Sequence, residues 1–364
     1  MTARYIPKRA ALACAALVAT GTAWAQSSGS SVNLYGVLDA CVVSNKSATG
    51  APVQINGGGC YYGSRLGFRG NEDLGGGMRA YFQLETGFAA DNGTLAQGGR
   101  LFGRKSIVGL AGGLGAVEIG REYAPAFYLL TSIDPMQLGI GSALATIWSG
   151  SPGTGAGRTD NSINYQSPDL GGFAVRVQAA LGEQAAPLAA RGGDSKGASL
   201  TYRNKQLYAA VSYESIANPT GTADDRATTI GAKYDFGSFS LSAIAQSGAW
   251  QGTRPESAPS SATSIYSRRF NSYLVGGSVR LGGDTLNATY KRYDDRTAAN
   301  FDATVLSAVY IHPLSKRTQL YGGISHLKNA RASSYGASDG NGGYSGVAAG
   351  GSSRIIDLGI THFF

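Results

Sequence analysis

The stretch IDLGITHFF, residues 356–364, alternates apolar with small or polar residues and stops on an aromatic. Its alternate residues fall on one face of a strand: Ile356, Leu358, Ile360, His362 and Phe364. A soluble protein usually lets its terminus fray. A closed membrane barrel has no free edge, so its last strand must pair with its first and the terminus becomes structural. The ending therefore favours an outer-membrane β-barrel.

Residues 1–25 show the three-part pattern of a secretory signal peptide. Three basic residues among the first nine precede an apolar run over 10–18, and Ala23 and Ala25 supply small residues at the cleavage-determining positions. The run is too short for the alternative of a membrane anchor, which needs about 20 residues. We therefore predict export through the Sec pathway and cleavage after Ala25, which leaves residues 26–364 as one barrel domain.

The composition fits a chain of many short, turned strands. The 364 residues include 20 Tyr, 12 Phe and 54 Gly, but only 11 Pro and 3 Met. Gly, Ser and charged residues interrupt every apolar run after the signal peptide, so no later stretch approaches a helical membrane span. Aromatic girdles at two membrane interfaces would use the Tyr and Phe. The net charge is +8, but Lys and Arg are dispersed, so we expect no nucleic-acid binding.

Sixteen strand-like segments recur between residues 31 and 364, an even number as bacterial single-chain barrels require. The segments are 31–44, 60–70, 76–90, 102–112, 114–122, 161–168, 172–182, 197–204, 206–215, 226–236, 239–248, 271–281, 285–295, 302–312, 318–328 and 353–364. Short turns and long polar loops alternate strictly between them, as periplasmic turns and external loops do in such barrels. The sequence therefore predicts an all-β fold, a 16-stranded antiparallel transmembrane β-barrel.

Alternation within the strands also suggests which face lines the interior. Leu66 and Phe68 oppose Arg65 and Arg69, so the charged face would line a closed lumen and the apolar face would contact lipid. A soluble sandwich alternates in the same way. The signal peptide, the loop asymmetry and the terminal strand together favour the barrel.

Two cysteines remain after the predicted cleavage site, Cys41 and Cys60. An exported protein meets an oxidising periplasm, and the pair flanks a loop rich in Gly and Asn, so a disulfide could staple it. By alternation Cys41 shares a face with Asp39, whereas Cys60 is out of phase with Arg65. A bulge or loop would be needed to restore a common face. The sequence leaves the bridge open.

Five motifs resemble the general porins of Neisseria and related proteobacteria. They are SSVNLYGVLDA at 30–40, SRLGFRGNEDLGGGMRAYFQLETGF at 64–88, FGRKSIVGLAGGLGAVEIGREYAP at 102–125, DNSINYQSPDLGGF at 160–173 and ITHFF at 360–364. The resemblance spans essentially the whole mature chain. It implies a homotrimer in the outer membrane of a Gram-negative bacterium, in which each barrel has its own water-filled pore for small hydrophilic or anionic solutes. It also implies contact with outer-membrane lipids and lipopolysaccharide, and reading of the terminal Phe364 by the barrel-assembly machinery.

The same resemblance implies that a long third external loop folds into the lumen and constricts the pore. That loop maps to residues 123–160, the longest connection in the chain; a floppy surface loop is the alternative. In the anion-favouring branch of the family, wall arginines face acidic residues near the constriction. Matched by motif, the arginines are Arg65, Arg104 and Arg158, and their acidic counterparts are Glu85 and Asp134.

Strand alternation independently places Arg65 and Arg104 on the lumen face but gives no support for Arg158, which lies at a loop end. Guanidinium groups in a low-dielectric constriction attract anions and repel cations, and they stay charged across physiological pH. Each arginine could equally form a structural ion pair that holds the loop. Four further basic residues are weaker candidates: Arg69, Arg79, Lys105 and Arg121. By strand alternation, Lys105 and Arg121 would face away from the lumen.

The expected function is passive diffusion of small hydrophilic solutes and ions, mildly favouring anions, without catalysis, cofactor or metal. The three histidines, His312, His326 and His362, are spread over different strands without ligand spacing. No residue is nominated as a nucleophile beside a histidine. An adhesin or receptor barrel and a substrate-specific channel remain as alternatives.

Overall fold

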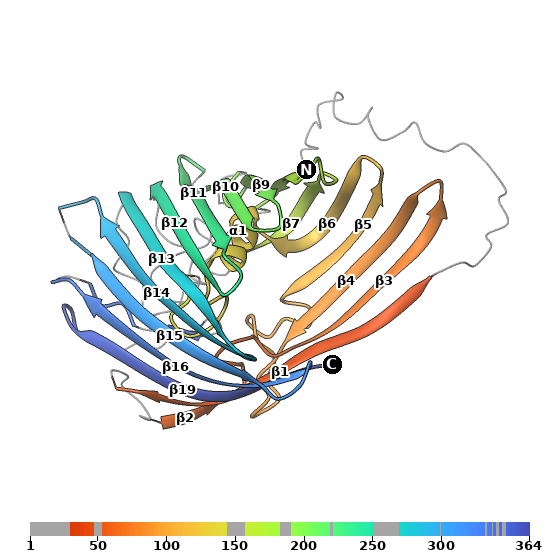
Figure 1. Ribbon diagram of the computed structural model, residues 1–364. Coiled ribbons are helices and arrows are strands. Elements are labelled where there is room, and N and C mark those ends of the chain that lie inside the picture. Colours follow the sequence, from red (N-terminus) through yellow and green to blue (C-terminus); the bar gives the residue numbers. More distant parts are fainter. Residues whose placement is uncertain are drawn as a thin grey trace.

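Sixteen antiparallel strands pair edge to edge, and the last pairs with the first, so the sheet closes into a barrel (Figure 1). This computed structural model describes residues 30–46, 53–143, 157–182, 191–218, 221–249, 269–298, 300–331, 333–336, 338–339, 342–343 and 347–364. The predicted signal peptide, residues 1–25, lies outside the described residues. Within them, none of the helices has the length and apolar character needed to cross a membrane.

The barrel strands are β1 (Ser31–Asn45), β3 (Arg65–Gly75), β4 (Met78–Gly87), β5 (Lys105–Gly112), β6 (Gly115–Tyr123), β7 (Arg158–Gln166), β8 (Phe173–Ala180), β9 (Ser195–Arg203), β10 (Leu207–Ala217), β11 (Asp224–Asp235), β12 (Phe239–Ala249), β13 (Arg269–Leu281), β14 (Asp284–Asp295), β15 (Ala303–Pro313), β16 (Thr318–Asn329) and β19 (Ser352–Phe363). The other elements are β2 (Val53–Asn56), α1 (Pro125–Ile133), β17 (Ser338–Asp339) and β18 (Gly342–Gly343). The predicted sixteen-stranded antiparallel barrel is confirmed.

One predicted strand boundary is wrong in a way that matters for the site. The segment expected at 60–70 begins only at Arg65 as β3, because residues 57–64 leave the wall and form a loop. Cys60 therefore lies in that loop rather than in a strand. Strand parity, which counted against a Cys41–Cys60 bridge, does not apply to it.

Closure of the barrel depends on β1, which divides its pairing between two neighbours. Its first half pairs with β3 from Ser31 to Val37, and its second half pairs with β19 from Val37 to Asn45. The expected pairing of the final strand with the first is confirmed. Beside the second half, β2 adds a short hairpin to β1.

A buried carboxylate reinforces this seam from inside the barrel. Asp39 of β1 accepts hydrogen bonds from the hydroxyls of Tyr321 on β16 and Thr361 on β19, both at 2.6 Å. It also accepts the backbone N–H groups of Cys60 at 2.9 Å and Tyr62 at 3.0 Å. One side chain thus joins the first strand, the last two barrel strands and the loop at 57–64.

The two faces of the sheet differ as a membrane barrel requires. On β19, Leu358 is 68% exposed on the outer face, whereas Thr361 is fully buried on the inner face. Outward side chains on the other strands are also large and apolar, among them Leu34, Val108, Ile119, Ile230, Leu241 and Leu306. Hydrocarbon would cover this outer band, and polar side chains face the lumen.

An aromatic ring lies over a glycine at the seam. Tyr321 of β16 and Gly359 of β19 are cross-strand partners, and a Cβ built on Gly359 would lie 2.4 Å from the Tyr321 ring and 2.8 Å from the backbone oxygen of Ala40. A side chain at this position would displace the tyrosine that donates to Asp39.

We therefore expect Gly359→Ala to destabilise the barrel by about 1–3 kcal/mol through overpacking. The measurement is the temperature at which the folded barrel converts to the unfolded form on a detergent gel. Gly283→Ala is the matched control, because a Cβ there meets open space in a turn. Equal transition temperatures for the two variants would contradict the seam's dependence on Gly359.

Candidate functional site

The connection after β6 turns into the barrel and begins with α1, which lies inside the wall (Figure 1). Pro125 opens the helix, where its missing N–H costs nothing. The preceding Ala124 supplies no side-chain cap; instead Glu214 of β10 accepts the backbone N–H of Ala126 at 2.9 Å. This carboxylate also complements the positive end of the helix. The helix is thus fastened to β10, four strands along the wall from β6.

Apolar packing fixes the other side of α1. Leu129, Leu130 and Ile133 are buried against three inward side chains from β10, β12 and β13: Ala210, Ile244 and Leu274. The described part of the predicted constriction loop therefore occupies the lumen. Residues 144–156 of that loop lie outside the described residues.

The segment after α1 is held by a buried lysine and a buried aspartate. Lys291 of β14, fully buried, donates to the Gly141 carbonyl and to Thr289 Oγ1. Asp134, 2% exposed, accepts the backbone N–H groups of Met136 at 2.9 Å and Ala143 at 2.6 Å. Burial raises the pKa of the Asp134 carboxyl, an effect that the nearby Lys291 charge opposes. These contacts define the turn that carries the loop along the wall.

Three of the predicted arginines come together on the opposite wall. Arg65 opens β3, Arg104 immediately precedes β5, and Arg158 opens β7. Arg104 is 3% exposed and its Nε lies 2.7 Å from Glu85 Oε1. Arg65 is within electrostatic reach of both Arg104 and Glu85. The predicted Glu85 is therefore the carboxylate of this cluster.

Aromatic side chains connect the arginine cluster to the loop. Arg158 donates to the Tyr123 hydroxyl at 2.7 Å, and its guanidinium lies 4.4 Å from the centre of that ring. Tyr123 in turn stacks on Phe127 of α1, with ring centres 3.8 Å apart. The positions of α1 and Arg158 are thus coupled through the rings of Tyr123 and Phe127. On the other side of the cluster, Tyr35 donates to Glu85 Oε2 at 2.9 Å.

Asp134 does not join this cluster. Among the described residues its side chain accepts hydrogen bonds from its own loop, and the opposite charge that acts on it is that of Lys291. Three guanidinium groups against the single Glu85 carboxylate leave the cluster with two net positive charges. Arg65 and Arg158 remain half-buried rather than enclosed, so their charge reaches the lumen more readily than that of Arg104.

Sequence reasoning missed an ion pair beside the cluster. Lys105, expected on the opposite parity, faces the lumen and pairs with the fully buried Glu122. The strand predicted at 102–112 begins at Lys105, so Arg104 lies before the strand and its side chain does not follow the strand's alternation. Ile107 and Val108 are both apolar, so the sequence offered no signal to choose the phase. The structure shows Ile107 buried and Val108 exposed.

The lumen also contains repeated stacking of arginine on tyrosine. Each of five guanidinium groups lies 4.1–5.3 Å from a ring centre. The pairs are Arg69 with Tyr35, Arg79 with Tyr81, Arg158 with Tyr123, Arg176 with Tyr128 and Arg203 with Tyr208. Such stacking holds the guanidinium near the wall while its edge stays available for hydrogen bonds.

The loop at 57–64 completes the site. A disulfide joins Cys41 to Cys60, with Cα atoms 6.1 Å apart. Tyr61 is buried beside Met136 and Ile140 of the constriction loop. The two inward segments therefore pack against each other. Within the described chain, no three His, Cys, Asp or Glu side chains are grouped as metal ligands.

Comparison with known proteins gives consistent matches over most of the chain. A family model described as Gram-negative porin matches residues 10–332. Outer membrane porin protein 32 of Delftia acidovorans is 35% identical to this chain, and the match covers 98% of this chain and 100% of that protein. An outer membrane porin protein of Bordetella pertussis is 31% identical over 87% of this chain and 94% of its own length. A solved anion-selective porin from Comamonas acidovorans is 32% identical, with a TM-score of 0.78 over 92% of this chain and all of that one.

The buried Lys291 provides a test of how the inward loop is held. Lys291→Met removes a charged donor from Gly141, and losing hydrogen bonds of this kind costs about 1.5–3 kcal/mol. Conformations in which the loop has left its place against the wall should then be roughly ten to a hundred times more populated than in the wild type. Single-channel recording in a planar bilayer should show more frequent closures and noisier open current.

Lys233→Met is the control, because Lys233 also lies on the lumen face but, among the described residues, forms no hydrogen bond or ion pair with the loop. Quiet recordings from both variants would show that other contacts suffice to hold the loop.

Proposed function

The chain belongs to the Gram-negative porin family, and we propose that its pore favours anions and that three copies assemble as a homotrimer. It is an outer-membrane porin, a passive water-filled channel rather than an enzyme. The observation that carries the anion preference is the cluster of Arg65, Arg104 and Arg158, in which Glu85 is the one described carboxylate that lies against the arginines, since the neighbouring Glu122 is paired with Lys105. The solved relative named anion-selective supports the same proposal.

The physical basis is electrostatic. The inward loop reduces the water available to screen charge at the cluster, so its positive potential extends across the opening. A small anion gains from that potential, whereas a cation must overcome it. Arginine stays protonated at any physiological pH, so the preference should not titrate. It should weaken as salt concentration rises, because mobile ions screen the potential over about 10 Å at 0.1 M.

The roles proposed for the individual residues follow from their burial. Arg65 and Arg158 present charge to the passing ion. Arg104, enclosed with Glu85, supports the wall and contributes a smaller share of the potential. Asp134 sets the fold of the loop instead of facing the arginines. The Cys41–Cys60 bridge holds the loop at 57–64 inward.

Three further proposals concern the export of the chain, the assembly of the barrel and its contact with lipid. Residues 1–25 direct export and are removed after Ala25. The barrel-assembly machinery reads the terminal Phe364, whose backbone N–H and C=O groups pair with those of Gly36. The assembled barrel then contacts outer-membrane lipids and lipopolysaccharide along its apolar outer band.

The ion preference is tested by Arg65→Gln combined with Arg158→Gln. This removes both net positive charges of the cluster while it keeps side chains that can donate hydrogen bonds. In a planar bilayer under a salt gradient, the wild-type reversal potential should favour chloride, and the double variant should move toward equal permeability or cation preference. The shift should be largest at low salt.

Arg280→Gln is the control, because Arg280 pairs with Asp235 at the far ends of their strands. An unchanged reversal potential in the double variant, or cation preference in the wild type, would refute the proposed constriction. Three-step closure of single insertions would support the homotrimer.

The proposed role of Phe364 makes a separate prediction. Deleting Phe364 should lower the amount of folded protein in the outer membrane without changing the conductance of the molecules that do assemble. Phe236→Ala, at an exposed turn between β11 and β12, is the control. Normal yield after the deletion would exclude an assembly role for Phe364.

A further inference from the structure

A continuous run of aromatic rings follows the side of α1 that does not pack against the wall. Tyr123, the last residue of β6, stacks on Phe127 with ring centres 3.8 Å apart and planes at 20°. Tyr128 meets both rings edge-on, at 6.0 Å from Tyr123 and 5.8 Å from Phe127. Phe127 and Tyr128 are half-buried, whereas the other side of the helix is buried against β10, β12 and β13. The inward loop therefore presents a surface of rings to the lumen.

A guanidinium lies at each end of this ring surface. At one end, Arg158 lies 4.4 Å from the centre of the Tyr123 ring; at the other, Arg176 of β8 lies 4.1 Å from the centre of the Tyr128 ring. Arg158 opens β7 at its external end, and the cross-strand partner of Arg176 is Gln166, the last residue of β7. The two arginines are thus anchored at opposite ends of one strand, and the rings bridge the interval between them.

Both guanidinium groups keep hydrogen-bonding capacity that no carboxylate uses. Within the described residues, Arg158 donates to a tyrosine hydroxyl and Arg176 to a glutamine side-chain oxygen, both at 2.7 Å, and neither forms an ion pair. Arg104 adds positive charge near Arg158, whereas the carboxylate of Glu118 lies within electrostatic reach of Arg176. An anion should therefore be held more tightly at Arg158 than at Arg176.

A buried glutamate fixes the orientation of both tyrosines. Glu122, fully buried and paired with Lys105, accepts the Tyr128 hydroxyl at 2.8 Å and the backbone N–H of Tyr123 at 2.6 Å. The rings are therefore held in place before a solute arrives. Contact with such a preorganised surface favours binding, because few side chains lose conformational entropy when the solute stacks on it.

We propose that the pore favours aromatic carboxylates among the organic anions that it passes. The ring of the solute stacks on Phe127 and Tyr128, while its carboxylate binds first to Arg158 and then to Arg176. This inference rests on the proposed function, because it requires a pore that admits anions. It names the class of solute that this part of the lumen recognises.

The chemistry of the surface distinguishes this class from other anions. An inorganic or aliphatic anion gains only from the guanidinium groups, whereas an aromatic carboxylate also gains from offset or edge-on contact with the rings. A guanidinium can in addition stack on the face of the solute ring. Because these contacts are individually weak and lie at successive positions, the solute can also leave, as conduction requires.

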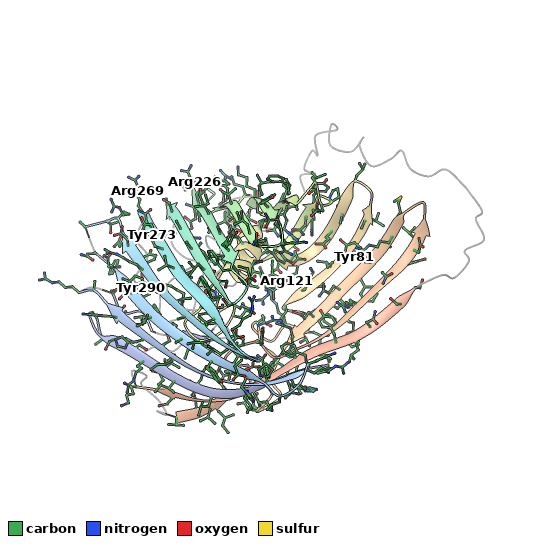
Figure 2. The ribbon with its side chains drawn as sticks, viewed as in Figure 1. Tyr81, Arg121, Arg226, Arg269, Tyr273 and Tyr290 are labelled. Carbon is green, nitrogen blue, oxygen red and sulfur yellow. A yellow bond between two sulfur atoms is a disulfide. The ribbon has the colours of Figure 1, made fainter. Side chains whose placement is uncertain are left out.

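Other arginine–tyrosine pairs in the lumen lack the second and third rings. Arg79 lies 5.2 Å from the centre of the Tyr81 ring on β4 (Figure 2), and Arg203 lies 5.0 Å from the centre of the Tyr208 ring on β10. Within the described part of the chain, no further aromatic ring stacks on either tyrosine. Each of these pairs offers a cation and one ring but no extended stacking surface.

The experiment compares benzoate with cyclohexanecarboxylate, which carry the same charge at nearly the same size but differ in the aromatic ring. The folded barrel conducts chloride in a planar bilayer while either carboxylate is added. The concentration that halves the single-channel current gives the apparent affinity. Phe127→Leu removes a ring of the stacking surface, Phe127→Tyr keeps it, and Arg176→Gln removes the inner guanidinium.

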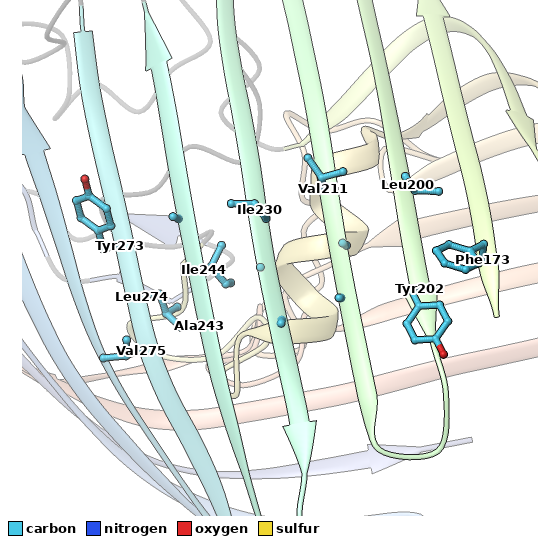
Figure 3. A pocket seen from close by; sticks show the side chains of 15 residues that line it. Phe173, Leu200, Tyr202, Val211, Ile230, Ala243, Ile244, Tyr273, Leu274 and Val275 are labelled. Carbon is cyan, nitrogen blue, oxygen red and sulfur yellow. The ribbon is translucent and has the colours of Figure 1, made fainter.

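Two control variants match these substitutions. Phe173→Leu also removes a ring in contact with a tyrosine, since its centre lies 4.7 Å from that of Tyr202. That ring is on the outer face of the wall, and Figure 3 shows α1 behind the strands. Arg203→Gln removes the guanidinium of an isolated pair. A detergent gel verifies that each variant is folded.

We expect the wild type to bind benzoate about 2- to 10-fold more tightly than cyclohexanecarboxylate, because an aromatic pair contributes to this extent beyond the area that it buries. Phe127→Leu should abolish this difference, whereas Phe127→Tyr should keep it. Arg176→Gln should weaken both carboxylates to a similar extent and leave their ratio unchanged. Both controls should match the wild type in the ratio and in the affinity for benzoate.

Three outcomes would overturn the inference. Equal affinities in the wild type would show that the rings only position the loop. A difference that survives Phe127→Leu would place the aromatic preference elsewhere in the lumen, and its loss in Phe173→Leu would show a general change of the barrel. The reversal potential in potassium chloride is recorded in parallel. Chloride preference without aromatic preference would refute this inference alone, whereas cation preference would refute the proposed function on which it rests.

Discussion

Backbone N–H and C=O groups in hydrocarbon must bond to one another, so a membrane sheet can have no open edge. The strand β1 satisfies this by pairing with β3 over one half and with β19 over the other. Every later feature uses the cylinder that this closure creates. The outer band is apolar because lipid surrounds it, and the interior can hold polar groups because water and the loops fill it.

Within that cylinder, the inward loop occupies part of the lumen and lies against the inner face of the wall. Three contacts hold the loop against the wall: the Glu214 carboxylate with α1, the Lys291 ammonium with Gly141, and the apolar side of α1 with β10, β12 and β13. The arginine cluster stands on the remaining wall, and Arg158 reaches the loop through Tyr123 and Phe127. Charge and loop position are therefore parts of one arrangement.

Much of the barrel could be predicted from sequence because strand alternation and loop length are local signals. All sixteen barrel strands were anticipated, whereas α1 and the loop at 57–64 were not, since their packing partners lie far away in the chain. Motif matching brought Arg65, Arg104 and Glu85 together correctly as neighbours. It could not distinguish the buried Asp134 from a lumen-facing carboxylate, nor find Lys105, whose strand phase is set by neighbours rather than by its own segment.

The carboxylate of Asp39 has a kinetic consequence. Its bond to Thr361 spans 322 residues and its bond to Tyr321 spans 282. Almost the whole polypeptide must lose conformational entropy before these hydrogen bonds can stabilise the barrel. Until they form, the Asp39 carboxyl lacks its two hydroxyl donors from β16 and β19. Closing the barrel and satisfying this buried carboxylate are consequently coupled events, because both require β19 to pair with β1.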